Sequence, residues 1–208
     1  MDFVNLIRSI PLVGTVPVSI MVAVLVIAAI GAFFFGTLKR NLVSVALAAA
    51  TGASFMREIL TGTYASDMGP WTPNAGEAMR YRNRLGRSDL VMLNNVSAEF
   101  ADSLDRRPLP DRARSAVFSS IPDAVLVSGA ITGEAANASD LEAVKRVLPN
   151  TPVLANTGVR HATVADVLRV ADGCIVGTSL KVDGNTWNPV DPERAREFMA
   201  IVKKTRTS

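Results

Sequence analysis

Apolar and polar positions form alternating blocks from about residue 41 to the end of the chain, and the blocks predict strands and helices in turn. Largely apolar runs predict strands at residues 53–59, 89–94, 123–128, 152–155 and 173–176. Helical spacing predicts helices at residues 42–50, 76–85, 139–148 and 162–171, with a last helix after residue 191. Helical residues are also predicted from Ala98, interrupted by Pro108 and Pro110, and continuing through residues 111–119. Strands that are apolar on both faces are typical of a parallel sheet covered by helices.

Local signals predict where two of these helices begin. Ser139 and Glu142 have the three-residue spacing of a capping box. Asp191 precedes Pro192, which predicts an N-cap followed by a proline in the first turn of the last helix. Residues 60–75, by contrast, contain glycines and prolines without regular spacing and predict a long loop. A loop of this length inside a compact domain is a candidate lid or binding loop.

Two stretches of the sequence resemble each other. Residues 122–129 and 171–178 both contain an aspartate, an apolar strand and then a small or hydroxyl residue. Repeated units of this kind suit a β/α barrel, whose functional residues gather at the carboxyl ends of the strands. Five or six strands cannot close an eight-stranded barrel. We therefore predict an α/β fold in which residues 41–208 form an incomplete (β/α)8 TIM-barrel-like domain with about five or six parallel strands.

The amino-terminal segment, residues 1–40, is predicted to contain one transmembrane helix at about residues 16–36. No charged residue lies between Arg8 and Lys39, and the apolar stretch approaches the ~20 residues that a spanning helix needs. Lys39 and Arg40 follow at once and outweigh Arg8, so the positive-inside bias places the large domain on the cytoplasmic side. We therefore expect a single-pass membrane protein.

Two other interpretations of this segment stay open. A signal peptide is disfavoured, because the leader is nearly neutral and the apolar stretch exceeds the ~7 to 15 residues of a usual hydrophobic region. The segment could also supply a pair of buried core elements, because it is broken near Gly31 and rich in β-branched residues, as parallel strands are. Residues 10–36 would then replace barrel strands instead of spanning a membrane.

Composition narrows the class of partner. The mean hydropathy of +0.26, with only 20% charged residues, is high for a soluble protein, and the apolar excess lies in the amino-terminal segment. The net charge is +3, but the basic residues are scattered among acidic ones without interleaved aromatic residues, so we do not expect nucleic acid as a partner. Cys174 is the only cysteine, which excludes an internal disulfide and suits a small buried hydrophobe.

The clearest candidate site follows the last two predicted strands, where the loops read NTG at residues 156–158 and GTS at residues 177–179. In barrels of this type the last strand-end loops bind phosphate through backbone N–H groups, with glycine allowing close approach and a helix terminus adding a favourable dipole. The alternative is that the glycines only turn the chain. The residues assigned to phosphate binding are Thr157, Gly158, Gly177, Thr178, Ser179 and Lys181.

Three charged residues are candidates for chemistry on a substrate. Arg57 and Glu58 lie at the end of a predicted strand, where charged side chains normally point into the barrel mouth, and Asp67 lies in the long loop. Arg57 and Glu58 could equally pair with each other or with a neighbour. Polar strand-end residues suited to hydrogen bonding are Asn94, Ser128, Thr132 and Asn156.

The remaining chemistry of the chain is sparse. His161, the only histidine, begins a predicted helix and suits a surface cap better than a catalyst. No metal-ligand cluster, nucleotide-binding P-loop or nucleophile elbow is present in the sequence, so we expect neither a metal nor a cofactor.

Several segments together resemble the BtpA/SgcQ family. They are residues 48–57, 78–82, 126–133, 152–154 and, above all, 172–181 (DGCIVGTSLK) with 188–191 (NPVD). The resemblance covers about residues 35–203. It implies a TIM barrel related to phosphate-binding barrels, in a family named for a factor that associates with thylakoid membranes and supports photosystem I accumulation. Other members resemble uncharacterised enzymes of sugar or nucleoside metabolism.

The chain departs from the family pattern in two places, which leaves two functional hypotheses. Members usually carry further strand–helix units where this chain has its apolar segment, so it resembles an N-terminally truncated or divergent member. Where members tend to have an aspartate and then a lysine–histidine pair, this chain has Asn94 and residues 97–99 (SAE). These departures favour support of the biogenesis or stability of a membrane complex such as a photosystem, with the open barrel edge covered by that complex or by a second copy. The intact phosphate loops favour a barrel enzyme that acts on a phosphorylated sugar or nucleoside-type metabolite.

Overall fold

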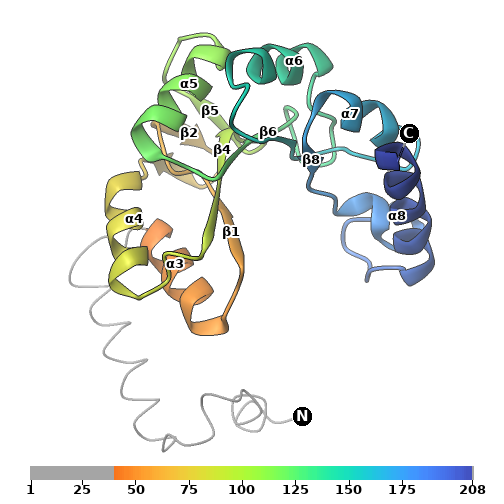
Figure 1. The fold of residues 1–208 in the computed structure, drawn as a ribbon, viewed down its shortest axis with the longest axis horizontal. Helices are drawn as coiled ribbons and strands as arrows, with labels where there is room; N and C mark the ends of the chain where they lie inside the picture. The colour runs from red at the N-terminus through yellow and green to blue at the C-terminus, as the bar shows by residue number, and fades with distance from the viewer. Residues whose placement is uncertain (1–39, 208) are drawn as a thin grey trace, which may run out of the picture. The chain divides into compact units, whose positions relative to one another are not determined.

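A computed structural model describes residues 40–207, in which parallel strands are flanked by helices (Figure 1). The helices are α3 (Arg40–Thr51), α4 (Ala75–Arg84), α5 (Leu109–Ser120), α6 (Ala138–Val147), α7 (Val164–Val170) and α8 (Pro192–Thr207), with the 3-10 turns η1 (Thr178–Leu180) and η2 (Val182–Gly184). The strands are β1 (Phe55–Glu58), β2 (Tyr64–Ser66), β3 (Gly69–Trp71), β4 (Val91–Ser97), β5 (Ala101–Ser103), β6 (Ala124–Val127), β7 (Val153–Ala155) and β8 (Gly173–Cys174).

Five of the strands form one parallel sheet in the order β1-β4-β6-β7-β8. The register is parallel at each step, with Arg57 opposite Leu93 and Leu126 opposite Leu154. Helices α3 to α8 each pack against the next one along the chain, and Figure 1 shows α4 to α7 following one another around the outside of the row of strands. This is a TIM-like half-barrel, because a complete barrel has eight such strands. The predicted parallel, incomplete barrel agrees with this sheet.

The two faces of the sheet have different neighbours because successive side chains of a strand point to opposite faces. Val125 and Val127 belong to a buried cluster that takes in side chains of α5, α6, α7 and α8. Leu93 and Leu126 pack with Ala124 in a separate cluster on the inner face. Full burial of each large aliphatic side chain contributes about 2 kcal/mol. The inner face ends, at the carboxyl ends of the strands, in polar side chains.

The repeated sequence stretches correspond to a repeated backbone contact. Asp123 precedes β6, and its Oδ2 accepts the backbone N–H of Met92 on β4 at 2.7 Å. Asp172 precedes β8, and its Oδ2 accepts the backbone N–H of Val153 on β7 at the same distance. In each unit the aspartate therefore accepts a backbone N–H of the neighbouring strand just before the paired residues of the two strands begin.

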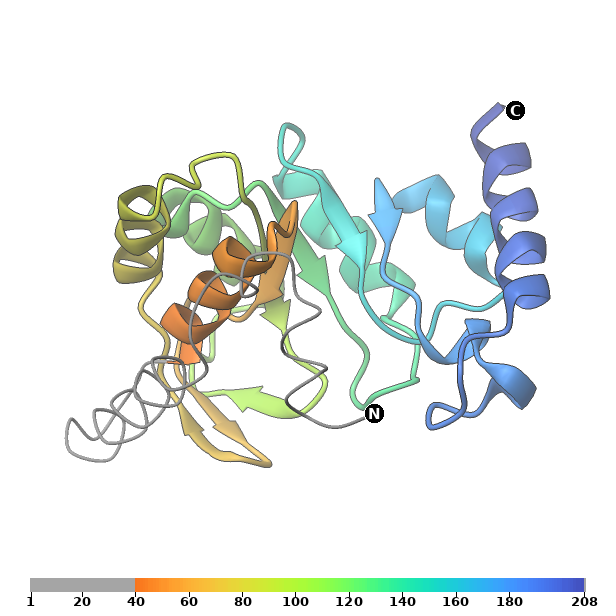
Figure 2. The same cartoon turned by 90° about the horizontal axis from the view of Figure 1, so that it is seen from below.

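The predicted long loop at residues 60–75 is folded differently from the expectation. It contains β2 and β3, which pair antiparallel, and β5 joins them in a three-stranded sheet of order β3-β2-β5. In Figure 2 this small sheet lies at the bottom of the molecule, away from α4 and α5. Trp71 and Phe100 meet edge to face, with ring centroids 6.3 Å apart, above a small core that includes Ile59 and Tyr64. Local packing of aromatic side chains therefore orders a segment whose glycines and prolines indicated a loop.

The helix starts follow the predicted chemistry in one case and shift in the other. At α8, Asp191 Oδ1 accepts the backbone N–H of Glu193 at 2.8 Å, which confirms the predicted cap. At α6 the cap is Asn137, whose Oδ1 accepts the backbone N–H of Ser139 at 3.1 Å. The predicted capping box at Ser139 was therefore wrong, because an amide two residues earlier caps the same turn.

The predicted transmembrane helix is corrected. Within residues 40–207, no helix has the length and apolar character that a membrane crossing requires. The segment at about residues 16–36 on which the prediction rested lies outside the described residues. The expected membrane location, with the large domain on the cytoplasmic side, rested on that helix alone and is withdrawn with it. The division of the chain at residue 40 stays a prediction.

Candidate functional site

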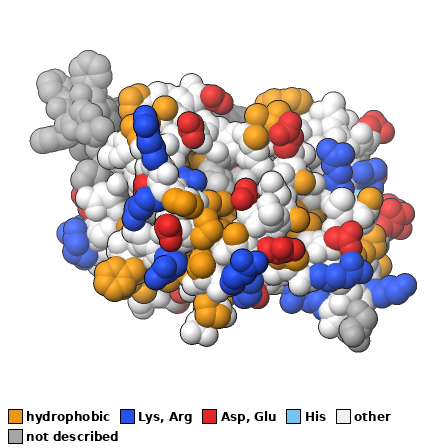
Figure 3. Space-filling model, turned by 90° about the horizontal axis from the view of Figure 1, so that it is seen from above, with side chains coloured by type: hydrophobic (Ala, Val, Ile, Leu, Met, Phe, Trp, Pro, Cys, Tyr) orange, Lys and Arg blue, Asp and Glu red, His pale blue; other side chains and the backbone are white. Residues whose placement is uncertain are grey.

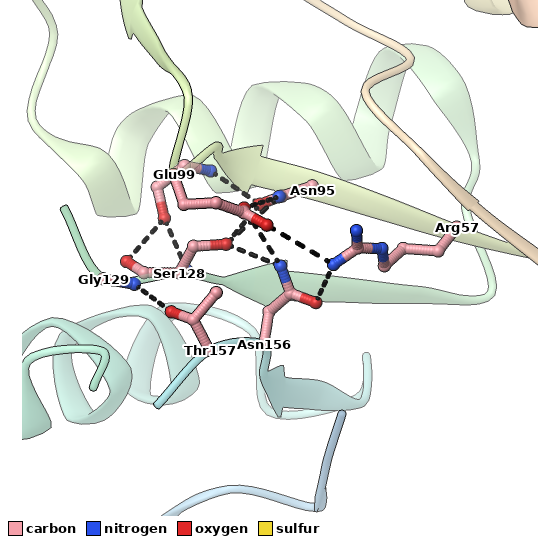
Figure 4. Close-up of polar contacts among 8 residues, drawn as sticks. Arg57, Asn95, Glu99, Ser128, Gly129, Asn156 and Thr157 are labelled. Atoms are coloured by element: carbon pink, nitrogen blue, oxygen red, sulfur yellow. Dashed lines mark hydrogen bonds and ion pairs between the residues drawn. The ribbon is translucent and has the colours of Figure 1, made fainter. Parts of the chain in front are cut away.

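Polar side chains at the carboxyl ends of β1, β4, β6 and β7 form one hydrogen-bonded network (Figure 4). Ser128 lies at its centre, because its Oγ accepts hydrogen bonds from Asn95 Nδ2 at 3.1 Å and from Asn156 Nδ2 at 2.7 Å. Thr157 extends the network, since its Oγ1 accepts the backbone N–H of Gly129 at 2.6 Å. A buried polar group left unpaired costs about 1–3 kcal/mol, so these bonds hold the strand ends together. The strand-end network comprises Arg57, Asn95, Glu99, Ser128, Asn156 and Thr157.

Glu99 is the buried carboxylate of the strand-end network. Its side chain is 7% exposed, and its Oε1 lies 3.8 Å from Nη1 of Arg57. Its Oε2 accepts hydrogen bonds from the side-chain amides of Asn95 and Asn156, both at 3.4 Å. Arg57 Nη1 also donates to Asn156 Oδ1 at 2.6 Å. A buried carboxylate is tolerated only with a cation and hydrogen bonds around it. Figure 4 shows these side chains converging on Glu99 from separate strands.

Strand alternation decides which of the predicted strand-end residues join the network. Arg57 joins it, whereas the adjacent Glu58 is on the opposite face, where Asn41 Nδ2 donates to its Oε1 at 3.4 Å. Asn95 also joins it. The adjacent Asn94, which the sequence singled out, instead accepts a backbone N–H from the segment after β1 at 2.9 Å. Glu58 and Asn94 therefore lie away from the network and support the fold beside it.

An open cavity of about 920 Å³ lies beside the strand-end network. All six residues predicted to bind phosphate line it, and so do Thr132 and Asn156. Its lining contains four cationic residues and one carboxylate; the cations are Arg57, Arg160, Lys181 and Arg194, and the carboxylate is Glu99. On the face shown in Figure 3, by comparison, Lys and Arg side chains alternate with Asp and Glu. The cavity is therefore a local concentration of positive charge.

The two glycines of the predicted phosphate loops have different surroundings. Gly158 has φ +65°, and a Cβ at this position would lie 2.1 Å from the backbone nitrogen of Ala135. Gly158 is thus required for the close approach of two loops. Gly177 has φ −127°, and a Cβ there would meet nothing within 4 Å. Of these two glycines, Gly177 therefore has open space beside it, while Gly158 has a structural reason to be glycine.

Positive charge reaches the cavity from side chains and not from a long helix. The helix after the Gly158 loop, α7, has seven residues, and η1 after Gly177 has three. A helix dipole requires several aligned turns of peptide units. The helix-terminus contribution expected from the sequence is therefore small. In the described part of the chain the Lys181 side chain makes no ion pair or hydrogen bond, which leaves its charge available to a ligand.

The hydroxyl groups of the GTS loop are held by neighbours. Thr178 Oγ1 lies 2.8 Å from Thr186 Oγ1, and Ser179 Oγ lies 2.9 Å from Nδ1 of His161. Arg194, in the first turn of α8, donates from Nε to the carbonyl oxygen of Ser179 at 3.0 Å. These contacts fix the loop against the segment after η2, the segment before α7 and the first turn of α8, so the cavity wall has a defined shape before a ligand binds.

Asp67 lies apart from the other predicted catalytic residues. It is on the turn between β2 and β3 and lines a second cavity of about 750 Å³. Glu99 lines this cavity as well as the cationic one. Arg57 and Asp67, which the sequence grouped as acting on one substrate, therefore lie on different cavities that meet at Glu99.

Sequence reasoning missed four side chains that shape the site, namely Asn95, Glu99, Arg160 and Arg194. Asn95 and Glu99 were missed because β4 extends to Ser97, three residues beyond the predicted end of the strand at Asn94. Arg160 directly follows the predicted phosphate loop, so its position was a usable signal. Arg194 lies far from that loop in the sequence, and only the packing of α8 brings it to the same cavity.

Within the described residues, the metal-ligand side chains are dispersed and the cysteine thiol is not activated. Among residues 40–207, no three side chains of His, Cys, Asp or Glu are grouped so that they could hold a metal ion. Burial raises the pKa of the Cys174 thiol, which keeps it in its less reactive protonated form.

A cationic cavity at the carboxyl edge of a parallel sheet with outer helices places the chain among TIM-like β/α barrel proteins. The model of the BtpA family matches residues 19–204, and the chain belongs to that family. The resemblance seen in the sequence is thereby confirmed.

Two relatives illustrate this membership. The chain is 44% identical over 160 residues to the putative sgc region protein SgcQ of Escherichia coli (strain K12). This match covers 77% of this chain and 60% of the relative. It is 33% identical over 157 residues to the Photosystem I biogenesis protein BtpA of Synechocystis sp.. That match covers 75% of this chain and 54% of the relative. The chain thus matches between 54% and 60% of the length of these relatives.

Solved structures support the fold. The N-(5'-phosphoribosyl)anthranilate isomerase of Pyrococcus furiosus superimposes with a TM-score of 0.53 at 15% identity. The match covers 78% of this chain and 69% of the isomerase. At this identity the likeness shows the fold alone.

Proposed function

We propose that the chain binds a phosphorylated small molecule in the cavity beside the strand-end network and acts on a phosphorylated sugar or nucleoside-type metabolite. The observation that carries this proposal is the lining, which contains four cationic residues and one carboxylate. Like charges gathered in a concave site focus an electric field that attracts an anion. The volume of about 920 Å³ lies within the range of small-molecule sites.

The lining divides into two ends with different roles. Lys181 and Arg194, with the open backbone at Gly177, form the end proposed to hold the phosphate. Arg57 and Glu99 form the other end and would face the rest of the molecule. Glu99 is the carboxylate of the lining and is held by three neighbours, so it is the candidate for proton transfer.

Calorimetric titration with inorganic phosphate, ribose 5-phosphate and ribose tests this proposal. Inorganic phosphate and ribose 5-phosphate are expected to bind, and ribose is not. Lys181→Met should weaken phosphate binding by about tenfold to a hundredfold, because a hydrogen bond to a charged group contributes about 1.5–3 kcal/mol. Arg146→Met is the matched control, since Arg146 is an exposed cation near the end of α6 and outside the cavity. Equal losses in both variants, or no binding of phosphate to the unmodified chain, would contradict the proposal.

A second candidate function is support of the biogenesis or stability of a protein complex of the photosystem type. The observation that favours it is the 33% identity to the Synechocystis protein named for photosystem I biogenesis. Among the described strands, β1 pairs on one side only, with β4, so the complex or a second copy of the chain could cover its other edge. Expression of the chain in Synechocystis lacking its own BtpA protein tests this candidate. Unrestored photosystem I levels would count against it.

A further inference from the structure

His161 connects three parts of the cavity wall. Its Nδ1 lies 2.9 Å from Ser179 Oγ, and its Nε2 lies 2.8 Å from the backbone carbonyl oxygen of Arg194. Phe198 holds the ring edge to face, with centroids 5.3 Å apart and an interplanar angle of 89°. Ser179 and His161 both line the cationic cavity. The imidazole is therefore fixed in orientation, with one nitrogen directed at a residue proposed to bind phosphate.

The two partners determine where the imidazole protons lie. The carbonyl oxygen of Arg194 can only accept, so Nε2 of His161 carries a hydrogen and donates it. In the neutral ring Nδ1 then has a lone pair and accepts the hydroxyl hydrogen of Ser179. In the protonated ring both nitrogens donate, so Nδ1 donates to Ser179 Oγ and the hydroxyl hydrogen becomes free.

A phosphate-type anion is matched better by the second arrangement. Its oxygen atoms accept hydrogen bonds, so a neutral His161 would leave the lone pairs of Ser179 Oγ facing an anion. Protonation of His161 reverses that hydrogen bond and adds a positive charge beside the cavity. We propose that a phosphate-type anion binds in this cavity together with a proton taken up by His161, which makes His161 and Ser179 a proton-linked anion receptor. This inference rests on the proposed anion site.

The charged surroundings of His161 fit this coupling. Arg160 is its neighbour in the chain, Lys181 follows η1, and Arg194 extends from α8 to the carbonyl of Ser179. Glu99 is the carboxylate of the same lining. The acidic residues of α8 near this point, Glu193 and Glu197, are exposed. An anion bound among the three cations adds an attraction to a protonated imidazole that the empty cavity lacks.

A chain prepared without a histidine tag gives an unambiguous test, because His161 is its only histidine. Sulfate is the probe, since it keeps its charge while histidine titrates between about pH 5 and 8. Calorimetry in two buffers of different ionisation enthalpy should show proton uptake approaching one proton per sulfate bound. The affinity for sulfate should fall by up to about tenfold for each unit by which the pH rises in that range. The ring nitrogen signals should change from neutral to protonated on saturation at a fixed pH near neutrality.

Three variants separate this coupling from a structural effect of His161. His161→Gln should bind sulfate with little dependence on pH. Ser179→Ala should weaken binding more at the acidic end of this range than at the alkaline end, because only the protonated imidazole frees the hydroxyl as a donor. Lys181→Met should lower affinity at every pH but keep the proton uptake, because it leaves the Ser179 and His161 pair intact.

The possible results lead to distinct conclusions. Sulfate binding without proton uptake, or with unchanged imidazole signals, overturns the proton-linked receptor and leaves the proposed anion site standing. Absence of sulfate and phosphate binding at every pH overturns both proposals. The unmodified chain supplies these measurements, so the test stands even if His161→Gln fails to fold.

Discussion

The strand-end network and the cavity wall around Gly177 meet at the carboxyl edge of the sheet. They differ in how many of their polar groups have hydrogen-bond or ion-pair partners within the protein. In the strand-end network, Glu99, Ser128 and Asn156 are buried and bonded mainly among themselves. Around Gly177 the wall is open, and Lys181 has no side-chain partner in the described part of the chain. The first region fixes geometry and the second offers charge. A ligand site needs both, because unpaired charge attracts a ligand only where a rigid frame holds it in place.

The largest expected effect of breaking this contrast is at the two glycines. Gly158→Ala should destabilise the fold by about 3 kcal/mol or more, because the new methyl group meets backbone 2.1 Å away at φ +65°. Gly177→Ala is the matched control and should cost about 1 kcal/mol or less, since open space surrounds that position. Urea unfolding followed by circular dichroism measures both. Similar losses for the two variants would mean that the frame and the open wall are not distinct.

The next effect concerns the carboxylate inside the network. Glu99→Gln should lower the free energy of unfolding by about 2 kcal/mol, because it removes the ion pair with Arg57 and leaves buried amides imperfectly matched. Glu134→Gln, at an exposed glutamate on the loop facing Gly158, should change stability by less than about 0.5 kcal/mol. The same unfolding experiment compares them. If Glu99→Gln left the free energy of unfolding unchanged, the carboxylate would serve binding and not the stability of the network.

The smallest effect concerns the backbone beneath both regions. The pKa of Asp172 is lowered from its ordinary value of 3.8: burial opposes the charged form, but hydrogen bonds from Lys145 Nζ and the Val153 N–H outweigh it. A carboxyl with a lowered pKa stabilises the fold above its unfolded pKa, and this contribution is lost as pH falls through the folded value.

Asp172→Asn should therefore cost about 1 kcal/mol near neutral pH, and the difference should shrink below about pH 4. Asp166→Asn is the control, because its pair with Arg169 is exposed on α7 and such pairs contribute little. Unfolding midpoints measured across this pH range test the sign. A penalty that stays constant into acid would show that the carboxylate charge is not the stabilising feature.

Much of the architecture followed from local patterns in the sequence. The apolar runs predicted the strands of the parallel sheet, and the Asp191-Pro192 pair predicted the start of α8. The antiparallel sheet containing β2 and β3 did not follow, because its strands are three residues long and one begins with Gly69-Pro70. Such short strands have no periodicity of their own and depend on contacts such as that of Trp71 with Phe100.

The candidate site divided in a similar way. The two loops assigned to phosphate binding stood out because glycine and hydroxyl residues follow predicted strands, and the structure brings all six assigned residues to one cavity. Their binding of phosphate stays a prediction. The choice between Asn94 and Asn95 could not be made, because it depends on which face of the sheet each residue takes. That choice shifts with a single residue of register.

The sequence alone determined the order of the main elements, the family and the position of the two glycine-containing loops, since each depends on neighbours along the chain. Only the tertiary structure placed Glu99 between two cavities and brought Arg194 to Ser179 and His161. These contacts join residues from different strand–helix units. Their partners are selected by the packing of the units, which no local pattern records.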